Sequence, residues 1–261
     1  MSASPPASGT LTLLERYRRV ALPLVAVAPR TPGLSTLVRG STTMYGDAAA
    51  EKFAAAVALW TDGALAWETE VRDLDYVHPA EIRVPDARAA GEPGLLEVFI
   101  TREAYVDGVE RPRVPGYEES WVFLVGGPAP GDTAVSVPSV PYIGSRKKGI
   151  DHKYQCFAGL RLARAWRSIG YVINPYPDPL DLRCWLQSTA GRAEEVLARP
   201  VPGRSVRTLD LTSLAAAGGA PDRFDYGTLI VWGSLKPQGY VAIQSPDGRT
   251  RAMDHFNPFW S

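Results

Sequence analysis

Glycine and proline interrupt this sequence so often that few long regular segments can form. The chain has 24 glycines and 23 prolines among its 261 residues, close to a fifth of the total. Both residues are unfavourable inside helices, whereas they are common in the turns that join short strands. Apolar residues make up 45 % and charged residues 21 %, which is a globular composition. We therefore predict a mainly β protein, a single-domain jelly roll or β-sandwich with two inserted helices.

The clearest strand pair is a hairpin between residues 53 and 71. Two apolar runs flank Asp62-Gly63, a dipeptide that favours the positive φ angles of a two-residue turn, although the alanine-rich residues 48–56 fit a helix equally well. The turn predicts that Trp60 and Trp67 lie close together on one face of the hairpin. A second hairpin is predicted around residues 245–248. Further runs rich in β-branched and aromatic residues predict strands at residues 36–45, 81–84, 95–101, 120–125, 133–140, 171–173, 182–187, 206–211, 227–232, 239–244 and 250–253.

Two helices are predicted between these strands. The first runs from Asp151 to Ser168, where apolar residues recur near helical spacing and Gly170 follows as a stop signal. The second runs from Thr189, a possible helix cap, to Ala198. A short helix is also expected at the start of residues 11–27, before an extended apolar run.

Composition divides the chain into three parts. Residues 1–10 are rich in proline, alanine and serine and are expected to form a mobile arm. Residues 11–253 are the β-rich, jelly-roll-like domain, and residues 254–261 are an aromatic tail. No internal sequence repeat is recognisable.

Composition and motifs exclude several classes of function. Lys+Arg and Asp+Glu are both 28, so the formal charge is zero and the chain cannot hold nucleic acid by bulk positive charge. Cys156 and Cys184 are not at paired spacing, and no two of the 3 histidines lie at metal-ligand spacing, so no metal site and no cofactor are expected. Phosphate-binding glycine loops and nucleophile motifs are absent. No apolar run is long enough to cross a membrane and no secretory signal is recognisable, so we expect a soluble protein without a membrane partner.

One pattern suggests catalysis. Asp73 and Asp75 are two residues apart, so on a strand they would share one face and could hold a divalent metal, with His78 close by. Residues 145–152, which end in His152, resemble the Ser/Lys/Gly/His segment of nucleotidyl transferases and archaeo-eukaryotic primases. That resemblance implies metal-dependent nucleotidyl transfer by Asp73, Asp75 and His152. A loop of solvated charges is the alternative interpretation.

Basic residues gather in two places and form the predicted nucleic-acid-binding site. On the predicted helix, three arginines would form a basic stripe that continues a cationic loop. A smaller cluster surrounds Tyr17 directly after the arm. The residues are Arg146, Lys147, Lys148, Lys153, Arg161, Arg164 and Arg167 in the first group, and Arg16, Arg18 and Arg19 in the second. A solvated surface whose counter-ions come from other strands remains the alternative.

The tail concentrates apolar area beyond the last predicted strand. Phe256, Pro258, Phe259 and Trp260 lie within its last six residues. Burial of two such rings would contribute several kcal/mol, at about 25 cal/mol per Å². Either the tail folds back on its own domain, or it docks on a neighbouring subunit as an assembly element.

The C-terminal region carries a family resemblance. Residues 227–243 and 253–260 resemble the closing strands and tail of the jelly-roll coat proteins of small plant RNA viruses, the bromovirus group most nearly, and residues 206–214 and 224–227 resemble the segment before them. The Pro/Ala/Ser-rich arm departs from the Arg/Lys-rich arm usual in those coats, and it is similar in composition to polymycovirus proteins. The resemblance implies self-assembly, with tails that clamp neighbouring subunits.

Three classes of function follow. The first is a structural coat protein, without enzymatic activity, that self-assembles and contacts viral RNA through its basic patch, in the virion or the host cytoplasm. The second is a non-catalytic bacterial binding module, such as an immunity or phage-structural protein. The third is the nucleotidyl transferase.

Overall fold

A computed structural model of the chain describes residues 11–29, 34–40, 52–75, 80–85, 93–113, 120–126, 134–138, 140–141, 154–161, 166–188, 193–217, 226–245, 251–255 and 257–258. These are called the described residues below. They are mainly β and form sandwiches of antiparallel sheets with few helices, so the predicted mainly β, sandwich class is confirmed. The helices in this part of the chain are short: α1 (Leu13–Arg18), α2 (Glu103–Val106) and α3 (Leu211–Ala217). None of them is long and apolar enough to cross a membrane.

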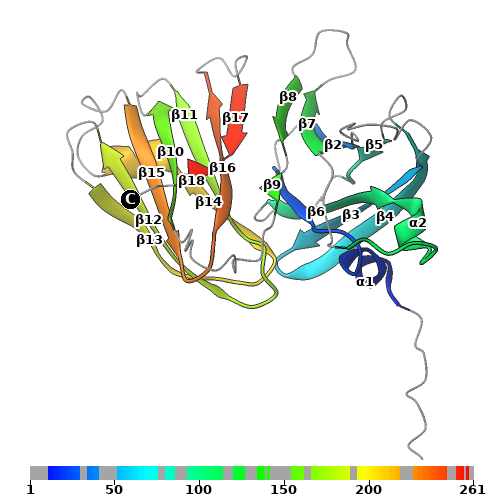
Figure 1. Ribbon diagram of the computed structural model, residues 1–261. Coiled ribbons are helices and arrows are strands. Elements are labelled where there is room, and N and C mark those ends of the chain that lie inside the picture. Colours follow the sequence, from blue (N-terminus) through cyan, green and yellow to red (C-terminus); the bar gives the residue numbers. More distant parts are fainter. Residues whose placement is uncertain are drawn as a thin grey trace, which may run out of the picture.

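The described strands form two groups that lie side by side (Figure 1). In the first group, β4-β3-β6-β1-β9 make sheet 1 and β5-β2-β7-β8 make sheet 2. The strands of this first half are β1 (Leu24–Ala28), β2 (Leu34–Gly40), β3 (Phe53–Thr61), β4 (Ala64–Leu74), β5 (Ala80–Arg83), β6 (Gly94–Arg102), β7 (Ser120–Gly126), β8 (Ala134–Pro138) and β9 (Val140–Pro141).

The second half has the same number of described strands and also two sheets. Here β13-β12-β15-β10-β18 make sheet 3 and β14-β11-β16-β17 make sheet 4. The strands are β10 (Tyr154–Arg161), β11 (Arg167–Asn174), β12 (Leu180–Ser188), β13 (Ala193–Val201), β14 (Ser205–Asp210), β15 (Tyr226–Gly233), β16 (Gln238–Gln244), β17 (Arg251–His255) and β18 (Asn257–Pro258).

The two halves have the same strand pairing. In each, the third strand pairs with the fourth and sixth, the second with the fifth and seventh, the first with the sixth and ninth, and the seventh with the eighth. The pairs are nested, because the first strand pairs with the sixth, the second with the fifth and the third with the fourth. A long hairpin that is rolled into two sheets has this pairing, which is the winding of a jelly roll. The chain therefore contains a structural repeat, although its sequence shows none. Sheets 1 and 3 are equivalent, and so are sheets 2 and 4.

The hairpin predicted at residues 53–71 is confirmed by β3 and β4. Asp62 and Gly63 form its turn with φ angles of 49° and 82°. The predicted contact between Trp60 and Trp67 is wrong, because the register shifts by one residue: Trp60 lies opposite Leu65, whereas Trp67 lies opposite the residue before Trp60. Neighbouring residues of a strand point to opposite faces, so the bulge sends the two tryptophans to different sides of the hairpin.

Both predicted long helices are wrong. Residues 154–161 and 167–174 are strands β10 and β11, and residues 193–201 are β13. In β10 a register shift between Ala158 and Leu160 breaks the alternation of apolar and polar residues that identifies a strand in a sequence. The short helix and extended run expected in residues 11–27 are confirmed by α1 and β1.

Two buried clusters fill the halves. In the second half, residues of sheets 3 and 4 meet in one apolar core around Leu182, Cys184 and Leu229. Strands β12 and β15 bury every second residue, so only the inner face of sheet 3 is covered among the described residues. In sheet 1, by contrast, β1, β3 and β6 are buried along nearly their whole length on both faces.

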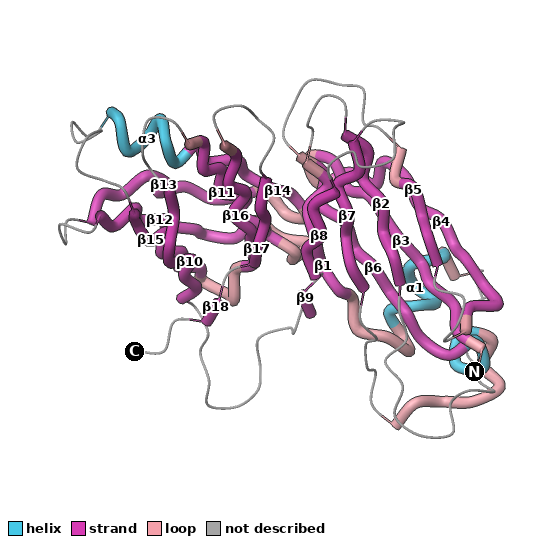
Figure 2. Tube along the Cα trace, turned by 90° about the horizontal axis from the view of Figure 1, so that it is seen from above, coloured by secondary structure: helices cyan, strands magenta, loops and turns pink. Residues whose placement is uncertain are grey.

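The second half contacts the first through the outer face of sheet 4. The outward residues Tyr171, Ile173, Val206 and Tyr240 belong to the buried cluster of the first half rather than to that of their own. The Tyr240 hydroxyl donates a 2.8 Å hydrogen bond to the carbonyl oxygen of Val25 in β1. At the far edges of sheets 2 and 4, β17 lies beside β8 (Figure 2). The halves are therefore joined by buried apolar contact and not only by the chain.

We expect Tyr240→Phe to destabilise the protein by about 1 kcal/mol, because it removes the hydrogen bond between the halves and leaves the buried Val25 carbonyl without that donor. Urea unfolding followed by tryptophan fluorescence measures the change. Tyr171→Phe is the matched control, since Tyr171 lies directly opposite Tyr240 and its hydroxyl has no partner among the described residues. Equal effects of the two substitutions would contradict the assignment.

Candidate functional site

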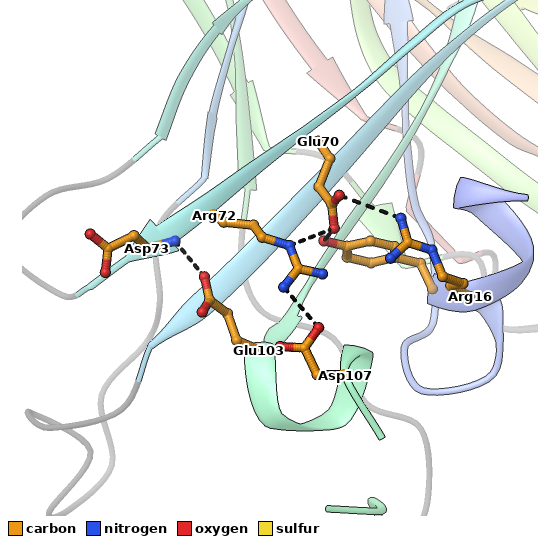
Figure 3. A network of polar contacts seen from close by, with 7 residues as sticks. Arg16, Glu70, Arg72, Asp73, Glu103 and Asp107 are labelled. Carbon is orange, nitrogen blue, oxygen red and sulfur yellow. Dashed lines mark hydrogen bonds and ion pairs between the residues drawn. The ribbon is translucent and has the colours of Figure 1, made fainter. Parts of the chain in front are cut away.

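A polar network fixes α1 to sheet 1 and includes arginines of the basic cluster predicted around Tyr17 (Figure 3). The Glu70 carboxylate of β4 accepts hydrogen bonds from the Tyr17 hydroxyl at 2.9 Å, from Arg72 Nε at 3.0 Å and from Arg16 Nη2 at 3.4 Å. Arg72 also donates to Asp107 at 2.8 Å. Burial, with the hydrogen bond to Glu70, raises the pKa of Tyr17 well above its ordinary value, so its hydroxyl keeps the proton it donates.

Local sequence explains why α1 forms. Thr12 Oγ1 accepts from the backbone N–H of Glu15 at 3.3 Å, and the Glu15 carboxylate accepts from the backbone N–H of Thr12 at 2.9 Å. This reciprocal cap satisfies two N–H groups that a helix start leaves unpaired. It also allows α1 to present Leu14 and Tyr17 to the sheet, where Tyr17 packs on Phe99 with ring centroids 6.1 Å apart.

Two of the three arginines predicted around Tyr17 are held by carboxylates. Arg16 pairs with Glu70, and Arg18 pairs with Glu97 at 2.7 Å. Arg19 is exposed at the C-terminal cap of α1. The ion pairs of Arg16 and Arg18 therefore serve mainly to hold α1 against sheet 1. Arg19 takes part in neither of these two ion pairs.

Asp73 and Asp75, the predicted metal ligands, converge on a lysine. Lys52 Nζ lies 3.0 Å from Asp73 Oδ1 and 3.4 Å from Asp75 Oδ2. The hydrogen bond that Lys52 donates to Asp73 raises the pKa of Lys52, so its charge is secure. Asp73 has a φ of 60°, and its backbone N–H donates to Glu103. The ammonium group of Lys52 thus provides the positive charge that a metal ion would provide in the predicted site. No cluster of metal-ligating side chains occurs within the described ranges. His78 and His152 lie outside the described residues.

The larger basic group, predicted between Arg146 and Arg167, is not a helical stripe. Arg161 ends β10 and Arg167 begins β11, so the helical spacing that would have aligned them is absent. The Arg167 side chain is 60 % exposed and lies 3.5 Å from Asp210. The remaining members, Arg146, Lys147, Lys148, Lys153 and Arg164, lie outside the described residues, so their role stays a prediction.

The tail folds back on its own chain as far as it is described. Asn257 and Pro258 form β18, which pairs with Cys156 and Gln155 of β10. β17 continues to His255, so the boundary predicted after residue 253 falls inside a strand. Phe256, Phe259 and Trp260 lie outside the described residues. The backbone of β18 supports the first of the two alternatives for the tail.

A buried carboxylate lies where the halves meet, and no sequence pattern indicates it. Glu97 of β6 is 2 % exposed, and it accepts 2.7 Å hydrogen bonds from Trp60 Nε1 and from Arg18. The Arg204 guanidinium, from the loop before β14, lies over the Trp60 ring at 4.3 Å from its centroid. Three segments far apart in the chain therefore meet at one ionic centre: α1, the β3–β4 hairpin and the second half.

The outer face of sheet 3 is the other feature that sequence reasoning missed. Its centre, called the aromatic face below, consists of Tyr154, Trp185, Ile230 and Trp232. Tyr154 lies directly opposite Trp232, and Trp185 lies directly opposite Ile230. Tyr154 is 43 % exposed, and no described element covers this face. The alternation in residues 182–187, with Leu182, Cys184 and Leu186 buried between outward neighbours, is the signal that could have identified it.

Comparison with known proteins identifies no relative. No protein-family model matches the chain, and no curated protein matches it. The structure has a weak likeness to that of β-glucuronidase 2 from Bacteroides uniformis covalently bound to cyclophellitol-6-carboxylate aziridine, with 10 % identity and a TM-score of 0.22. The match covers 90 % of this chain but 26 % of that enzyme. A TM-score this low carries no argument about fold or function.

We expect Arg18→Ala to destabilise the protein by about 2–4 kcal/mol, because it leaves the Glu97 carboxylate buried without its cation. Arg16→Ala is the control, since the Arg16–Glu70 pair is more exposed, and it should cost about 1 kcal/mol or less. The double variant Arg18→Ala/Glu97→Gln should recover part of the loss. Chemical denaturation measures all four proteins, and similar losses for the two single variants would contradict a buried ionic centre.

Proposed function

We propose that this protein is a structural, self-assembling protein of the coat type that contacts viral nucleic acid. The observation that carries the proposal is the pairing of two jelly rolls in one chain, joined by a buried interface. Jelly rolls are a recurrent architecture of viral capsid proteins. The support is analogy at the level of the fold, together with the C-terminal resemblance.

The enzymatic alternative no longer has its main support. Asp73 and Asp75 are paired with Lys52, and Glu103 is bonded to the backbone of Asp73. An ammonium group that lies between two carboxylates competes with a divalent cation for them, so it weakens metal binding there. The binding-module alternative is compatible with the same sandwiches, and it differs from the coat in predicting a protein that stays monomeric.

We expect the purified chain to form large particles or defined capsomers as its concentration rises and ionic strength changes. Light scattering after size exclusion gives the mass of the species, and electron micrographs give their shape. A binding module or an enzyme of this size would stay small under every condition. A protein that remains a monomer at millimolar concentration would contradict the coat proposal.

Nucleic-acid contact by the loop cations is tested separately. Replacement of Arg146, Lys147 and Lys148 by alanine should lower the slope of log K against log salt for RNA binding by about one unit for each phosphate that the variant no longer neutralises. The control is Arg111→Ala/Arg113→Ala, which removes two exposed arginines from another part of the sequence. Wild-type protein with no affinity for RNA or DNA at low salt would contradict this part of the proposal.

A further inference from the structure

The aromatic face has the composition of an interface centre. Three aromatic rings and an isoleucine occupy neighbouring strands, while charged and polar residues surround them. Arg183 lies over the Trp185 ring at 5.2 Å from its centroid and is paired with Glu195 at 2.6 Å. Protein interfaces combine an aromatic-rich centre with a polar rim in this way. A surface of this composition is a candidate docking surface.

The repeat shows what covers the equivalent surface in the first half. Sheet 1 corresponds to sheet 3, and its outer face is buried under α1 and the second half. Arg204 of the second half lies over Trp60, and a Cβ atom on Gly63 would approach the Gly203 carbonyl oxygen to 2.9 Å. Next to this contact, Tyr240 of sheet 4 bonds to Val25 of β1, the strand equivalent to β10.

The strand positions that form this internal interface therefore each occur twice, although the residues at them differ. Sheet 1 is covered by the outer face of sheet 4, whereas no described element packs on the outer face of sheet 3, which is equivalent to sheet 1. Sheet 2, equivalent to sheet 4, has an outer face on which no described element packs. We propose that a second copy of this chain docks on the aromatic face with the outer face of its sheet 2, and so repeats between chains the contact that joins the two halves. This rests on the proposed self-assembly.

Charged residues flank both surfaces. Asp181, Arg183 and Glu195 are exposed or half-buried on the outer face of sheet 3. Sheet 2 presents Arg39, Glu81 and Arg83 on one exposed face. Charges of both signs around each surface can form the polar rim of a contact between two copies.

The contact is head to tail, since it joins different surfaces of the two copies. Interfaces of this class close into rings or continue as open chains, depending on the rotation between neighbours. Each added copy brings a new open sheet 3. A single interface therefore suffices for assembly beyond a dimer.

The test is the association of the full chain measured by sedimentation velocity over a concentration series. Tyr154→Arg places a charge at the centre of the aromatic face on a residue that is 43 % exposed, so the fold should tolerate it. We expect its dissociation constant to rise at least tenfold over the wild type, as for an anchor residue of an interface. Val109→Arg, at a position that is 79 % exposed in the loop after α2, is the control and should associate as the wild type does.

A second measurement needs no substitution. The chain has 2 cysteines; Cys156 points outward beside the aromatic face and is partly exposed, whereas Cys184 is buried. We expect a maleimide to modify Cys156 quickly in dilute protein and several-fold more slowly in associated protein. Cys184 reports unfolding, because it reacts only when the core opens.

The outcomes separate the two proposals. Particles that form equally well with Tyr154→Arg, and with Cys156 still reactive, would overturn the docking surface and leave the coat proposal standing. Short oligomers that Tyr154→Arg dissociates, without particles under any condition, would support the surface and overturn the coat. A protein that is monomeric throughout would overturn both. Binding of a sugar or an RNA that protects Cys156 in the monomer would replace the second copy as occupant.

Discussion

Sheet 1 is apolar on both faces, and the rest of the molecule is arranged to keep both faces from water. β1, β3 and β6 are buried nearly throughout, so a single partner sheet is not sufficient. Sheet 2 covers one face. The other is divided between α1, which carries Tyr17, and the second half, which carries Tyr171, Ile173 and Tyr240. Because β3 presents small alanines on this side, a helix can approach it closely, and the buried Glu97 is tolerable only because Arg18 and Trp60 satisfy it.

Local chemistry determined which parts of the fold could be predicted from the sequence. Asp62-Gly63 specifies its turn by φ preference, and Thr12 with Glu15 specifies a helix start, so both elements follow from residues adjacent in the chain. The failures occur at bulges. One extra residue between Leu65 and Trp67 reverses the side on which Trp67 lies, and the irregularity at Ala158 hides the alternation of β10. Apolar residues of an irregular strand then imitate helical spacing.

The candidate sites depend on contacts between distant segments, which no local pattern reports. Lys52 is 21 residues from Asp73, and its ammonium group changes a predicted metal site into an ion-paired one. The aromatic face requires the register of β12, β15 and β10, which brings Trp185, Trp232 and Tyr154 together from three places in the chain. The repeat is also not recognisable in the sequence. Two segments can adopt the same strand pairing when their burial patterns and loop lengths are alike, and this does not require similar residues.

Two equivalent halves joined by an unsymmetrical contact leave one surface of each half without a described partner in the chain. If the halves were related by a two-fold axis, the same patch would be buried on both and nothing would be left over. Here Arg204 of the second half lies over the Trp60 ring of the first half. Among the described residues, no arginine or lysine of the first half lies over the Trp185 ring. Arg183, from the same strand as Trp185, stacks on that ring instead. The contact therefore distinguishes donor from acceptor surface. An unsymmetrical contact of this kind joins different surfaces of two partners and so has a direction. The same contact can then be repeated from each copy to the next, which builds a repeating assembly.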